Sequence, residues 1–450
     1  MSGLEELSRD DLIELVVRQG AYNDELVKRV AELEGELERL KSGQGPSAPG
    51  APDWVKPSRK ERRTTERKQR KQSFVRRKSV QPTHVVRHAA EGCPDCGRKL
   101  SGGWLHRTRE VIEIPAVPVE IIQHQIIARK CGVCGNRVLP KVDLSAIALG
   151  KSRIGVRLTS LIAHLHTVCR IPLGTIQKLL KALYGLDVSL GELTRLLHKV
   201  AEHGRSEYEA LGKKIRGSPV VNADETGWRE DGVNGYVWSF STPDIRYFLW
   251  RKSRGQDIAV EGLGKDFRGI VVSDFYCGYN KINSRHQRCW VHLLRDLEKL
   301  EEMHPEDEGV KRWVTYIKQL YRAARAFSSS DAKERLDYRY ACEDALMDAA
   351  RPFVKTDLPQ HTLASRIEKF LPELFVFVEE PDVPADNNAA ERAVRPVVIA
   401  RKISGGTRSA KGSRTREVLA SLFGTWAAQG QDTLVTCQQM LTKTALSHQP

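Results

Sequence analysis

The chain has 450 residues, of which 40% are apolar and 29% are charged, a composition typical of a globular protein of about three domains. We expect neither export nor membrane insertion, because no run approaches the ~18 apolar residues of a membrane span and the N-terminus lacks the basic and apolar regions of a signal peptide. The net charge of +15 favours a polyanionic partner such as nucleic acid.

Residues 1–42 are predicted to form a helix that pairs as a coiled coil. Ser8 and Asp11 resemble a capping box, and core residues then follow at alternating steps of three and four. These core positions are Leu12, Val16, Asn23, Leu26, Val30, Leu33, Leu37 and Leu40. Asn23 suits the fixing of register in a homo-oligomer, and a single amphipathic helix packed on its own protein is the alternative.

Residues 43–85 combine a linker with a basic arm. Residues 43–52 are rich in Gly, Pro, Ala and Ser, and residues 56–78 hold twelve Lys or Arg against two Glu, a net +10. Such a run binds DNA phosphates by counterion release, without base selectivity, unless it is simply a solvated arm. The arm residues expected to contact DNA are Arg62, Arg63, Arg67, Lys68, Arg70, Lys71, Arg76 and Arg77.

Residues 86–145 predict a zinc ribbon. Cys93 and Cys96 form one Cys-x-x-Cys pair, and Cys131 and Cys134 form a second, each followed by glycine. Two such pairs can supply the four thiolates of a structural zinc site, whereas one pair would suffice for redox chemistry. β-Rich stretches at residues 109–114 and 119–128 would form the hairpin between the pairs.

Residues 150–210 predict a helical domain that binds DNA. We expect helices at residues 154–168, after Pro172, and at residues 189–203, where Ser189 and Glu192 resemble a capping box. Short helices joined by tight turns suggest a helix-turn-helix with residues 189–203 as the DNA-reading helix. A helical bundle that does not read DNA remains an alternative.

Residues 216–295 predict the first part of a ribonuclease H-like core. The expected order is three strands, a helix and a fourth strand, at residues 218–224, 235–241, 246–250, 255–263 and 268–274. The first strand ends in Asp224 and the fourth in Asp274, and a third acid is expected on a later helix, at Glu391. Each acid alone has an ordinary explanation, as a turn former or as the partner of a helix cap.

Three carboxylates suit two-metal phosphodiester chemistry. Two Mg²⁺ or Mn²⁺ ions about 3.5–4 Å apart activate the attacking oxygen and stabilise the leaving oxygen. Magnesium takes hard oxygen ligands, and carboxylates that close together are tolerable chiefly because cations neutralise them.

Residues 296–380 predict a helical insertion, with helices at residues 310–326, 332–350 and 363–370. It separates Asp274 from Glu391 by 117 positions, too many for a simple loop. Residues 381–430 would complete the core, with a helix at 419–428, and residues 431–450 would form a tail. The basic tract after Glu391 is a candidate DNA track, or else a solvated loop, and its expected contacts are Arg395, Arg401, Lys402, Arg408 and Lys411.

Four motifs together resemble bacterial transposases of the insertion sequence 66 family. They are Asn-Ala-Asp-Glu-Thr-Gly-Trp at residues 222–228, Ser-Asp-Phe-Tyr-Cys-Gly-Tyr at 273–279, Cys-Trp-Val-His-Leu-Leu-Arg-Asp at 289–296 and Asn-Asn-Ala-Ala-Glu-Arg at 387–392. The resemblance implies a cytoplasmic DDE-type transposase in which Asp224, Asp274 and Glu391 hold the metal ions. It also implies cleavage of double-stranded DNA at element ends, then joining of the freed 3′-hydroxyl to target DNA, with accessory proteins as possible partners.

Two further residue sets remain open. Cys289 and His292 match a Cys-x-x-His feature of the family, which we interpret as packing or support of the site rather than as a metal site. Tyr276 and Tyr279 would serve a tyrosine recombinase, a reading that the acidic triad makes unnecessary.

The predicted fold class is therefore multidomain α+β, with a ribonuclease H-like α/β core that carries a helical insertion. A coiled coil, a zinc ribbon and a helix-turn-helix-like domain precede this core. The alternatives to a transposase are a DNA-binding regulator without catalysis and a ribonuclease H-like nuclease that cuts without joining. Retention of all three acids favours an enzyme.

Overall fold

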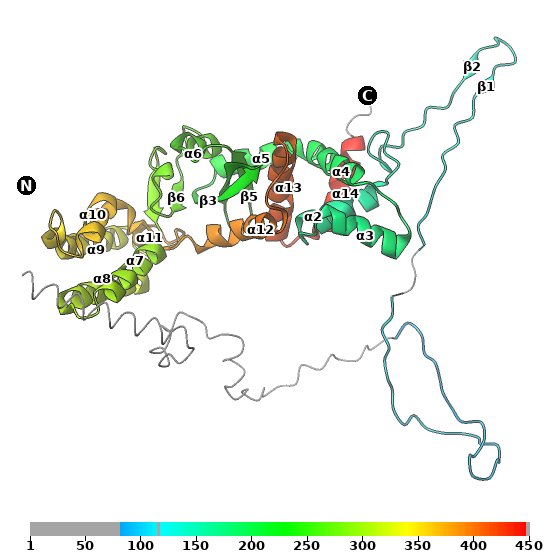
Figure 1. Cartoon of the computed structure of the whole chain (residues 1–450), viewed down its shortest axis with the longest axis horizontal. Helices are drawn as coiled ribbons and strands as arrows, with labels where there is room; N and C mark the ends of the chain where they lie inside the picture. Colours follow the sequence, from blue (N-terminus) through cyan, green and yellow to red (C-terminus); the bar gives the residue numbers. More distant parts are fainter. Residues whose placement is uncertain (1–81, 115–117, 447–450) are drawn as a thin grey trace, which may run out of the picture. The chain divides into compact units, whose positions relative to one another are not determined.

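The computed structural model describes residues 82–114 and 118–446, which belong to two units, residues 1–114 and residues 115–450. The predicted coiled coil and the basic run at 56–78 lie outside the described residues. Figure 1 shows the course of the chain and labels its helices and strands. In the first unit, the described residues form extended chain and a turn around Cys93 and Cys96.

The second unit contains a helical region with α2 (Val156–Thr167), α3 (Leu173–Tyr184), α4 (Leu190–His203) and α5 (Arg205–Arg216). The first three confirm the predicted positions, and Ser189 caps α4 by accepting a hydrogen bond from the N–H of Glu192 (3.1 Å). Helix α5 was not predicted. Glycine at 204 is required between α4 and α5, because a Cβ atom there would lie 2.4 Å from Leu422.

A mixed sheet follows, in the order β5-β4-β3-β6-β7. Its strands are β3 (Val220–Glu230), β4 (Val233–Ser241), β5 (Arg246–Arg251), β6 (Ile270–Ser273) and β7 (Arg285–Arg288), and α6 (Gln256–Leu263) lies between β5 and β6 in sequence. Strand β3 pairs antiparallel with β4, and β4 with β5, whereas β6 runs parallel to both β3 and β7. The sequence predicted these strands except β7.

Helices cover both faces of the sheet. Because side chains alternate between the two faces along each strand, residues of β3 contribute to two apolar cores. Val221 and Ala223 join a core with residues of α5 and α6, while Trp228 lies on the opposite face with Val397 and Ala400 of α12. Helix α12 (Asn388–Ser404) is followed by α13 (Ala410–Ala428), which packs along β5, and by α14 (Thr433–Leu446).

The turn between α12 and α13 is tied to the far end of β3. Thr407 donates its N–H to the carbonyl of Arg229 (2.8 Å), and Asp231 donates its N–H to the carbonyl of Thr407 (2.8 Å). Gly406 has φ +131°, and a Cβ atom there would lie 2.1 Å from the carbonyl oxygen of Arg229. Only glycine permits this close approach.

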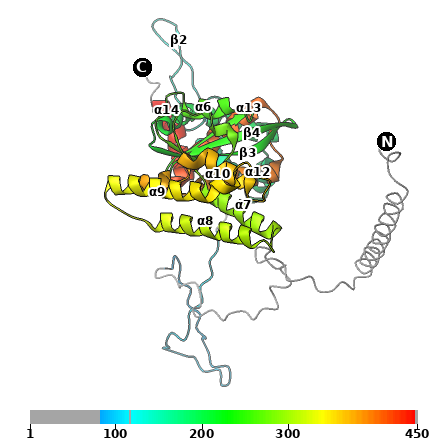
Figure 2. The same ribbon diagram turned by 90° about the vertical axis from the view of Figure 1, so that its left-hand side faces the viewer.

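A helical insertion separates β7 from α12, as predicted. It comprises α7 (Trp290–Met303), α8 (Glu308–Ala326), α9 (Ala332–Ala350), α10 (His361–Phe370) and α11 (Val376–Glu379). Figure 2 shows α8 and α9 side by side. The insertion has an apolar core of its own, in which Trp290 stacks on Tyr321 with ring centroids 4.8 Å apart.

Two predictions, one for the strands at residues 109–114 and 119–128 and one for the tail at residues 431–450, differ from the structure. Residues 109–114 and 119–128 form no strands in the described ranges, and the hairpin there is limited to β1 (Arg129–Lys130) and β2 (Arg137–Val138). The apolar residues of those segments stay exposed, since a module this small buries too little surface to hold long strands by packing alone. The predicted tail is largely helix α14, whose Cys437 and Leu441 are buried in the core.

Candidate active site

The three predicted acids lie at one edge of the sheet. Asp224 is in β3, Asp274 directly follows β6, and Glu391 is in the first turn of α12. The parallel register pairs Asn222 with Val272, so two further residues along each strand bring Asp224 level with Asp274. The tertiary structure thus gathers acids from three distant segments.

The electrostatics of Asp224 show how close these carboxylates are. Burial, together with the negative charges of Glu225, Asp274 and Glu391, raises the pKa of Asp224 to about 7, although a hydrogen bond from the Glu225 N–H (2.9 Å) opposes the shift. The acids therefore repel one another. As the side chains stand in the described residues, no three His, Cys, Asp or Glu form a group able to hold a metal ion.

Glu391 lies near two side chains of the insertion. Its Oε1 lies 3.5 Å from a guanidinium nitrogen of Arg295 and 4.0 Å from Nε2 of His292, both on α7. The sequence did not single out Arg295. Its spacing from His292, one helical turn further along, was the signal that could have found it.

Glu225 lies beside Asp224 in sequence but belongs to the opposite face of the sheet. The hydroxyl of Tyr279 donates to one of its carboxylate oxygens, and Nε of Arg254 donates to the other (3.1 Å). Burial raises the pKa of Glu225, and these two donors oppose the shift. Glu225 is therefore neutralised by protein partners, which leaves Asp224 as the acid of this pair with free acceptor capacity.

Arg288 of β7 holds the backbone beside Asp274 through hydrogen bonds. This fully buried guanidinium donates to the carbonyl of Asp274 (2.9 Å), to Oγ of Ser273 (3.2 Å) and to Oδ1 of Asn280 (2.7 Å). Glu373 balances its charge. The side chain of Asp274 also accepts a hydrogen bond from the N–H of Tyr276 (2.9 Å).

Cys289 of the Cys-x-x-His feature lies in the interior of the protein. It is fully buried, and burial raises the pKa of its thiol. Its Sγ accepts a hydrogen bond from the N–H of Asn387 (3.1 Å). This position agrees with the interpretation of Cys289 as part of the support of the site.

The two tyrosines proposed for a recombinase are both engaged. Tyr279 is fully buried, and burial together with its bond to Glu225 raises its pKa well above the ordinary value. The hydroxyl of Tyr276 donates to the carbonyl of Arg254 (2.7 Å), whose guanidinium stacks 3.9 Å from the Tyr276 ring. Neither hydroxyl is placed as a nucleophile.

The predicted basic tract is mainly helical, in α12 and α13, and its members differ in role. Arg395, Lys402, Arg408 and Lys411 are exposed. Arg401 faces β3, where it donates to the carbonyl of Gly227 and to Oγ1 of Thr226. Helical spacing accounts for this position, because it puts residue 401 on the same face of α12 as the buried Val397.

Helix α4, the predicted DNA-reading helix, has one buried face. Leu193, Leu196 and Val200 are fully buried, and the helix packs between α2 and α13. The opposite face, with Gly191, Arg195 and Glu202, is exposed along the helix, which a helix that enters the major groove requires. The exposed Arg195 is paired with Glu192 on the same helix.

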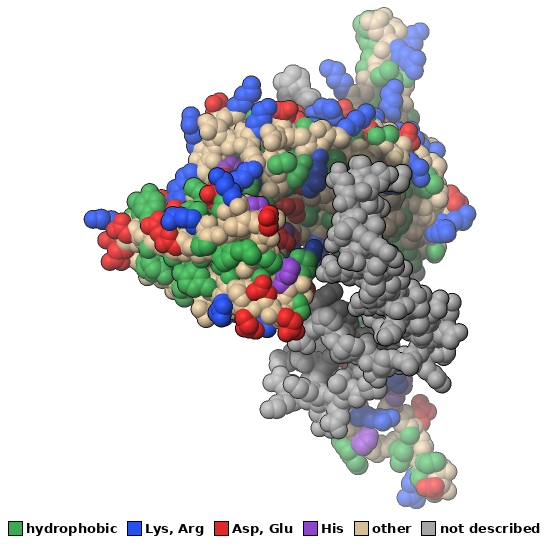
Figure 3. Space-filling view, turned by 60° about the vertical axis from the view of Figure 1, so that its left-hand side comes forward, with side chains coloured by type: hydrophobic (Ala, Val, Ile, Leu, Met, Phe, Trp, Pro, Cys, Tyr) green, Lys and Arg blue, Asp and Glu red, His purple; other side chains and the backbone are tan. Residues whose placement is uncertain are grey.

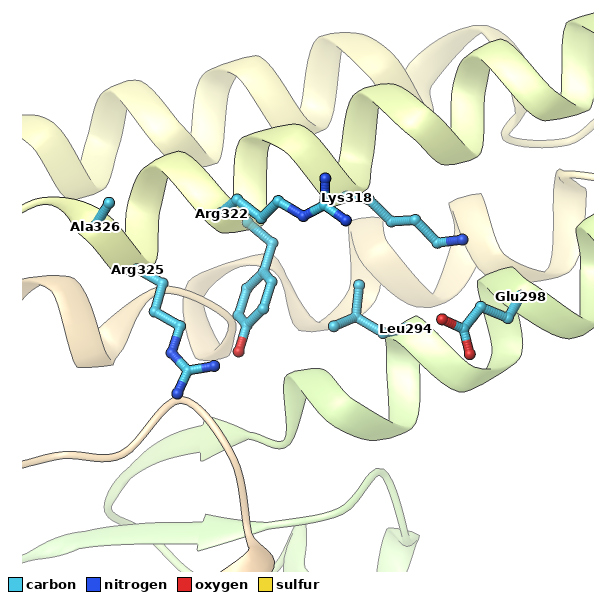
Figure 4. A pocket seen from close by; sticks show the side chains of 7 residues that line it. Leu294, Glu298, Lys318, Arg322, Arg325 and Ala326 are labelled. Carbon is cyan, nitrogen blue, oxygen red and sulfur yellow. The ribbon is translucent and has the colours of Figure 1, made fainter. Parts of the chain in front are cut away.

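An open groove of about 410 Å³ lies between α7 and α8 and is separate from the three acids. Figure 4 shows Lys318 of α8 extending toward the side of the groove where Glu298 of α7 lies, whereas Arg325 lies at the other end of the groove. Lys318 is already paired with Glu301 (3.1 Å). The mixed charges make this groove a weak candidate for a catalytic site.

The two Cys-x-x-Cys pairs belong to separate units but form the same local turn. Gly97 donates its N–H to the carbonyl of Cys93 (2.9 Å), and Gly135 donates its N–H to the carbonyl of Cys131 (3.0 Å). The glycines have φ +72° and +71°. Backbone N–H groups lower the thiol pKa of the first cysteine in each turn, an environment that favours thiolates.

The surface of the described residues carries both signs of charge. In the face shown in Figure 3, Lys and Arg side chains spread along the upper part, whereas Asp and Glu gather in clusters at the lower left. The run at 56–78 alone accounts for +10 of the net +15.

Within the described ranges, no helix has the length and apolar character needed to cross a membrane.

Comparison with known proteins found relatives of this chain and a family model that matches it. An uncharacterized protein of Sinorhizobium fredii, y4jD, is 26% identical over 410 residues, which cover 80% of this chain and 77% of the relative. Another from the same organism, y4jO, is 33% identical over 161 residues, covering 35% of this chain and 47% of the relative. The family model described as Transposase IS66 family matches residues 151–415, well over half of the chain and all three acids. The chain belongs to the IS66 family of transposases.

Proposed function

We propose that the chain is a DDE-type transposase that cuts and joins double-stranded DNA with Asp224, Asp274 and Glu391. The observation that carries the proposal is the position of the three acids, on β3, after β6 and in the first turn of α12, where the charges of Asp274 and Glu391 both act on Asp224. The strand order supports it: three antiparallel strands followed by two parallel ones, with acids on the central strand and its parallel neighbour, is the arrangement of a ribonuclease H-like core.

The residues present fit a pair of Mg²⁺ or Mn²⁺ ions. They supply hard carboxylate oxygens in a partly buried setting, and the raised pKa of Asp224 means that a cation would relieve an existing repulsion. Bound divalent ions would activate the attacking oxygen and stabilise the leaving oxygen. Glu391 would be the third ligand to these ions, and Arg295 and His292 lie beside its carboxylate in the metal-free structure.

The exposed cations of α12 offer the route for DNA. Arg392, Arg395 and Lys402 are exposed, and their spacing of three and seven residues places them along one side of α12 after Glu391. Phosphates next to the scissile bond would therefore contact them one after another. In the helical domain, α3 is a further candidate for a DNA contact beside α4, because it exposes Lys178, whereas its exposed Lys181 is paired with Asp187 (2.9 Å).

We further propose that Cys93, Cys96, Cys131 and Cys134 bind one structural zinc ion. Support comes from the shared turn at each pair and from backbone donors that favour the thiolate form. Four thiolates complete the coordination of zinc and leave no position for catalysis.

The decisive experiment uses Mg²⁺ and DNA fragments that carry the ends of the element. Wild-type protein is expected to nick the ends, and Asp224→Asn is expected to abolish nicking while DNA binding persists. Asp266→Asn, an exposed aspartate outside the site, is the matched control and should cleave normally. Retained cleavage by Asp224→Asn would remove that residue from the mechanism.

Pre-cut ends separate the transposase from its alternatives. Joining of such ends to target DNA supports a transposase, and cleavage without joining identifies a ribonuclease H-like nuclease. A wild-type protein that binds the ends but neither cuts nor joins them would be a DNA-binding regulator.

A further inference from the structure

A single buried asparagine links the helix of Glu391 to the strand of Asp224. Asn387 is 2% exposed and directly precedes α12. Its Nδ2 donates to the carbonyl of Ala223 (2.7 Å), and its Oδ1 accepts from Nδ2 of Asn222 (3.1 Å). Its own carbonyl accepts the N–H of Glu391 (3.2 Å), so the asparagine fixes both the start of the helix and the acid on it.

A buried cysteine links the same asparagine to the strand of Asp274. Sγ of Cys289 accepts a hydrogen bond from the N–H of Asn387 (3.1 Å), and the N–H of Cys289 donates to the carbonyl of Ser273 (2.8 Å). The next residue, Trp290, donates its N–H to the carbonyl of Ala385 (3.0 Å). The start and the end of the helical insertion are therefore held together at this point.

These bonds meet the backbone immediately beside each acid. Ala223 precedes Asp224, Ser273 precedes Asp274, and Asn387 lies one helical turn before Glu391. A shift at either Cys289 or Asn387 would change the spacing of the carboxylates without touching them. The chemistry of each residue suits this task, because the amide of asparagine both donates and accepts, and a neutral thiol accepts an N–H in an apolar setting.

We infer that Cys289 and Asn387 are positioning residues, a clamp that sets the spacing of the three acids and thereby their affinity for divalent cations. This inference rests on the proposed function. It assigns to the Cys-x-x-His motif a hydrogen-bond acceptor at Cys289 in place of a metal ligand. It also explains how an acid 117 positions beyond Asp274 returns to it.

The variants are chosen to change one bond each. Asn387→Asp keeps the shape but replaces the donor facing the Ala223 carbonyl with an acceptor. Cys289→Ala removes the acceptor, and Cys289→Ser keeps one. Cys437→Ala controls for the loss of a fully buried thiol, and Asn234→Asp, exposed at the other end of the β3–β4 hairpin, controls for the added charge.

The experiment measures Mn²⁺ binding to the full chain without DNA, by calorimetry and by the rise in melting temperature. Loss of such support around metal ligands typically weakens metal affinity by about 10–100-fold, so we expect at least a tenfold increase in the half-saturating concentration for Asn387→Asp and Cys289→Ala. We expect Cys289→Ser to recover most of the affinity and both controls to bind like the wild type.

The outcomes separate the clamp from the function on which it rests. Unchanged affinity in Asn387→Asp and Cys289→Ala would overturn the clamp while the metal site stands. Affinity that falls in Cys437→Ala by the same factor would also overturn it, since any buried thiol would then have that effect. A wild-type protein that binds no Mn²⁺ would overturn the metal mechanism itself.

Discussion

Replacing Asp224 with asparagine should stabilise the metal-free protein. Burial and three neighbouring carboxylates raise the pKa of Asp224 from 3.8 to about 7, which corresponds to a penalty of roughly 4 kcal/mol on its charged form. Asparagine has no charge and keeps an oxygen that can accept the N–H of Glu225. The free energy of unfolding should therefore rise by up to about 4 kcal/mol above pH 7.

The stability difference between wild type and Asp224→Asn should depend on pH. Because the folded-state pKa lies above the unfolded-state value, the penalty is absent below about pH 4, grows between about pH 4 and 7, and is fully present above that range. The advantage of Asp224→Asn over wild type should follow the same course. Added Mg²⁺ should stabilise the wild type and leave the variant almost unchanged.

Urea denaturation in EDTA at pH 4, 6 and 8, repeated with Mg²⁺ at pH 8, measures these differences. Asp266→Asn serves as the control, because this exposed aspartate is not among the carboxylates that raise the pKa of Asp224. If Asp224→Asn is less stable than wild type in EDTA at pH 8, the three acids do not repel one another and the reasoning fails.

Four further outcomes are expected. Arg288→Met should lower the free energy of unfolding by about 3 kcal/mol in urea titrations, because it breaks a buried ion pair, and a loss below about 1 kcal/mol would contradict its role as a support. Arg395→Ala should reduce the slope of log K for DNA binding against log salt by about 0.9, whereas Arg401→Ala should lower stability and keep the slope; equal slopes would contradict the two assignments. Deletion of residues 56–78 should weaken DNA binding and flatten its salt dependence, and an unchanged slope would count against a phosphate-binding arm. Metal analysis should find about one zinc per chain, lost in Cys93→Ser, and a folded wild type without zinc would refute the ribbon.

Elements with a strong local signal were predicted well. The bounds of α9 are those expected, residues 332–350, and the cap of α4 at Ser189 is present. Strand β7 was missed, because Arg285, His286, Gln287 and Arg288 show no apolar pattern. Three of these polar residues are buried all the same, since partners from other segments satisfy them, as when Gln287 donates to the carbonyl of Leu374 (3.0 Å).

Side-chain roles within a correctly predicted element were harder to foresee. Arg401 and Arg395 belong to one basic tract in the sequence, yet the first faces β3 and the second faces solvent. Helix α4 was predicted as a reading helix from its cap and length, and its contacts with α2 and α13 decide which of its faces is covered. Which face of an element is covered depends on distant segments, and local sequence does not contain that information.

By itself, the sequence determined the candidates for the chemistry, which are the acids at 224, 274 and 391 and the paired cysteines, and it predicted the order of strands between the acids. Those features are local, because they depend on residue type and on short-range periodicity. Only the tertiary structure decided that Arg295 and His292 face Glu391, that Arg288 supports Asp274, and that Cys289 and Asn387 join the three segments. Contacts between residues a hundred positions apart form only when the whole core packs, so they appear in the fold and not in the pattern.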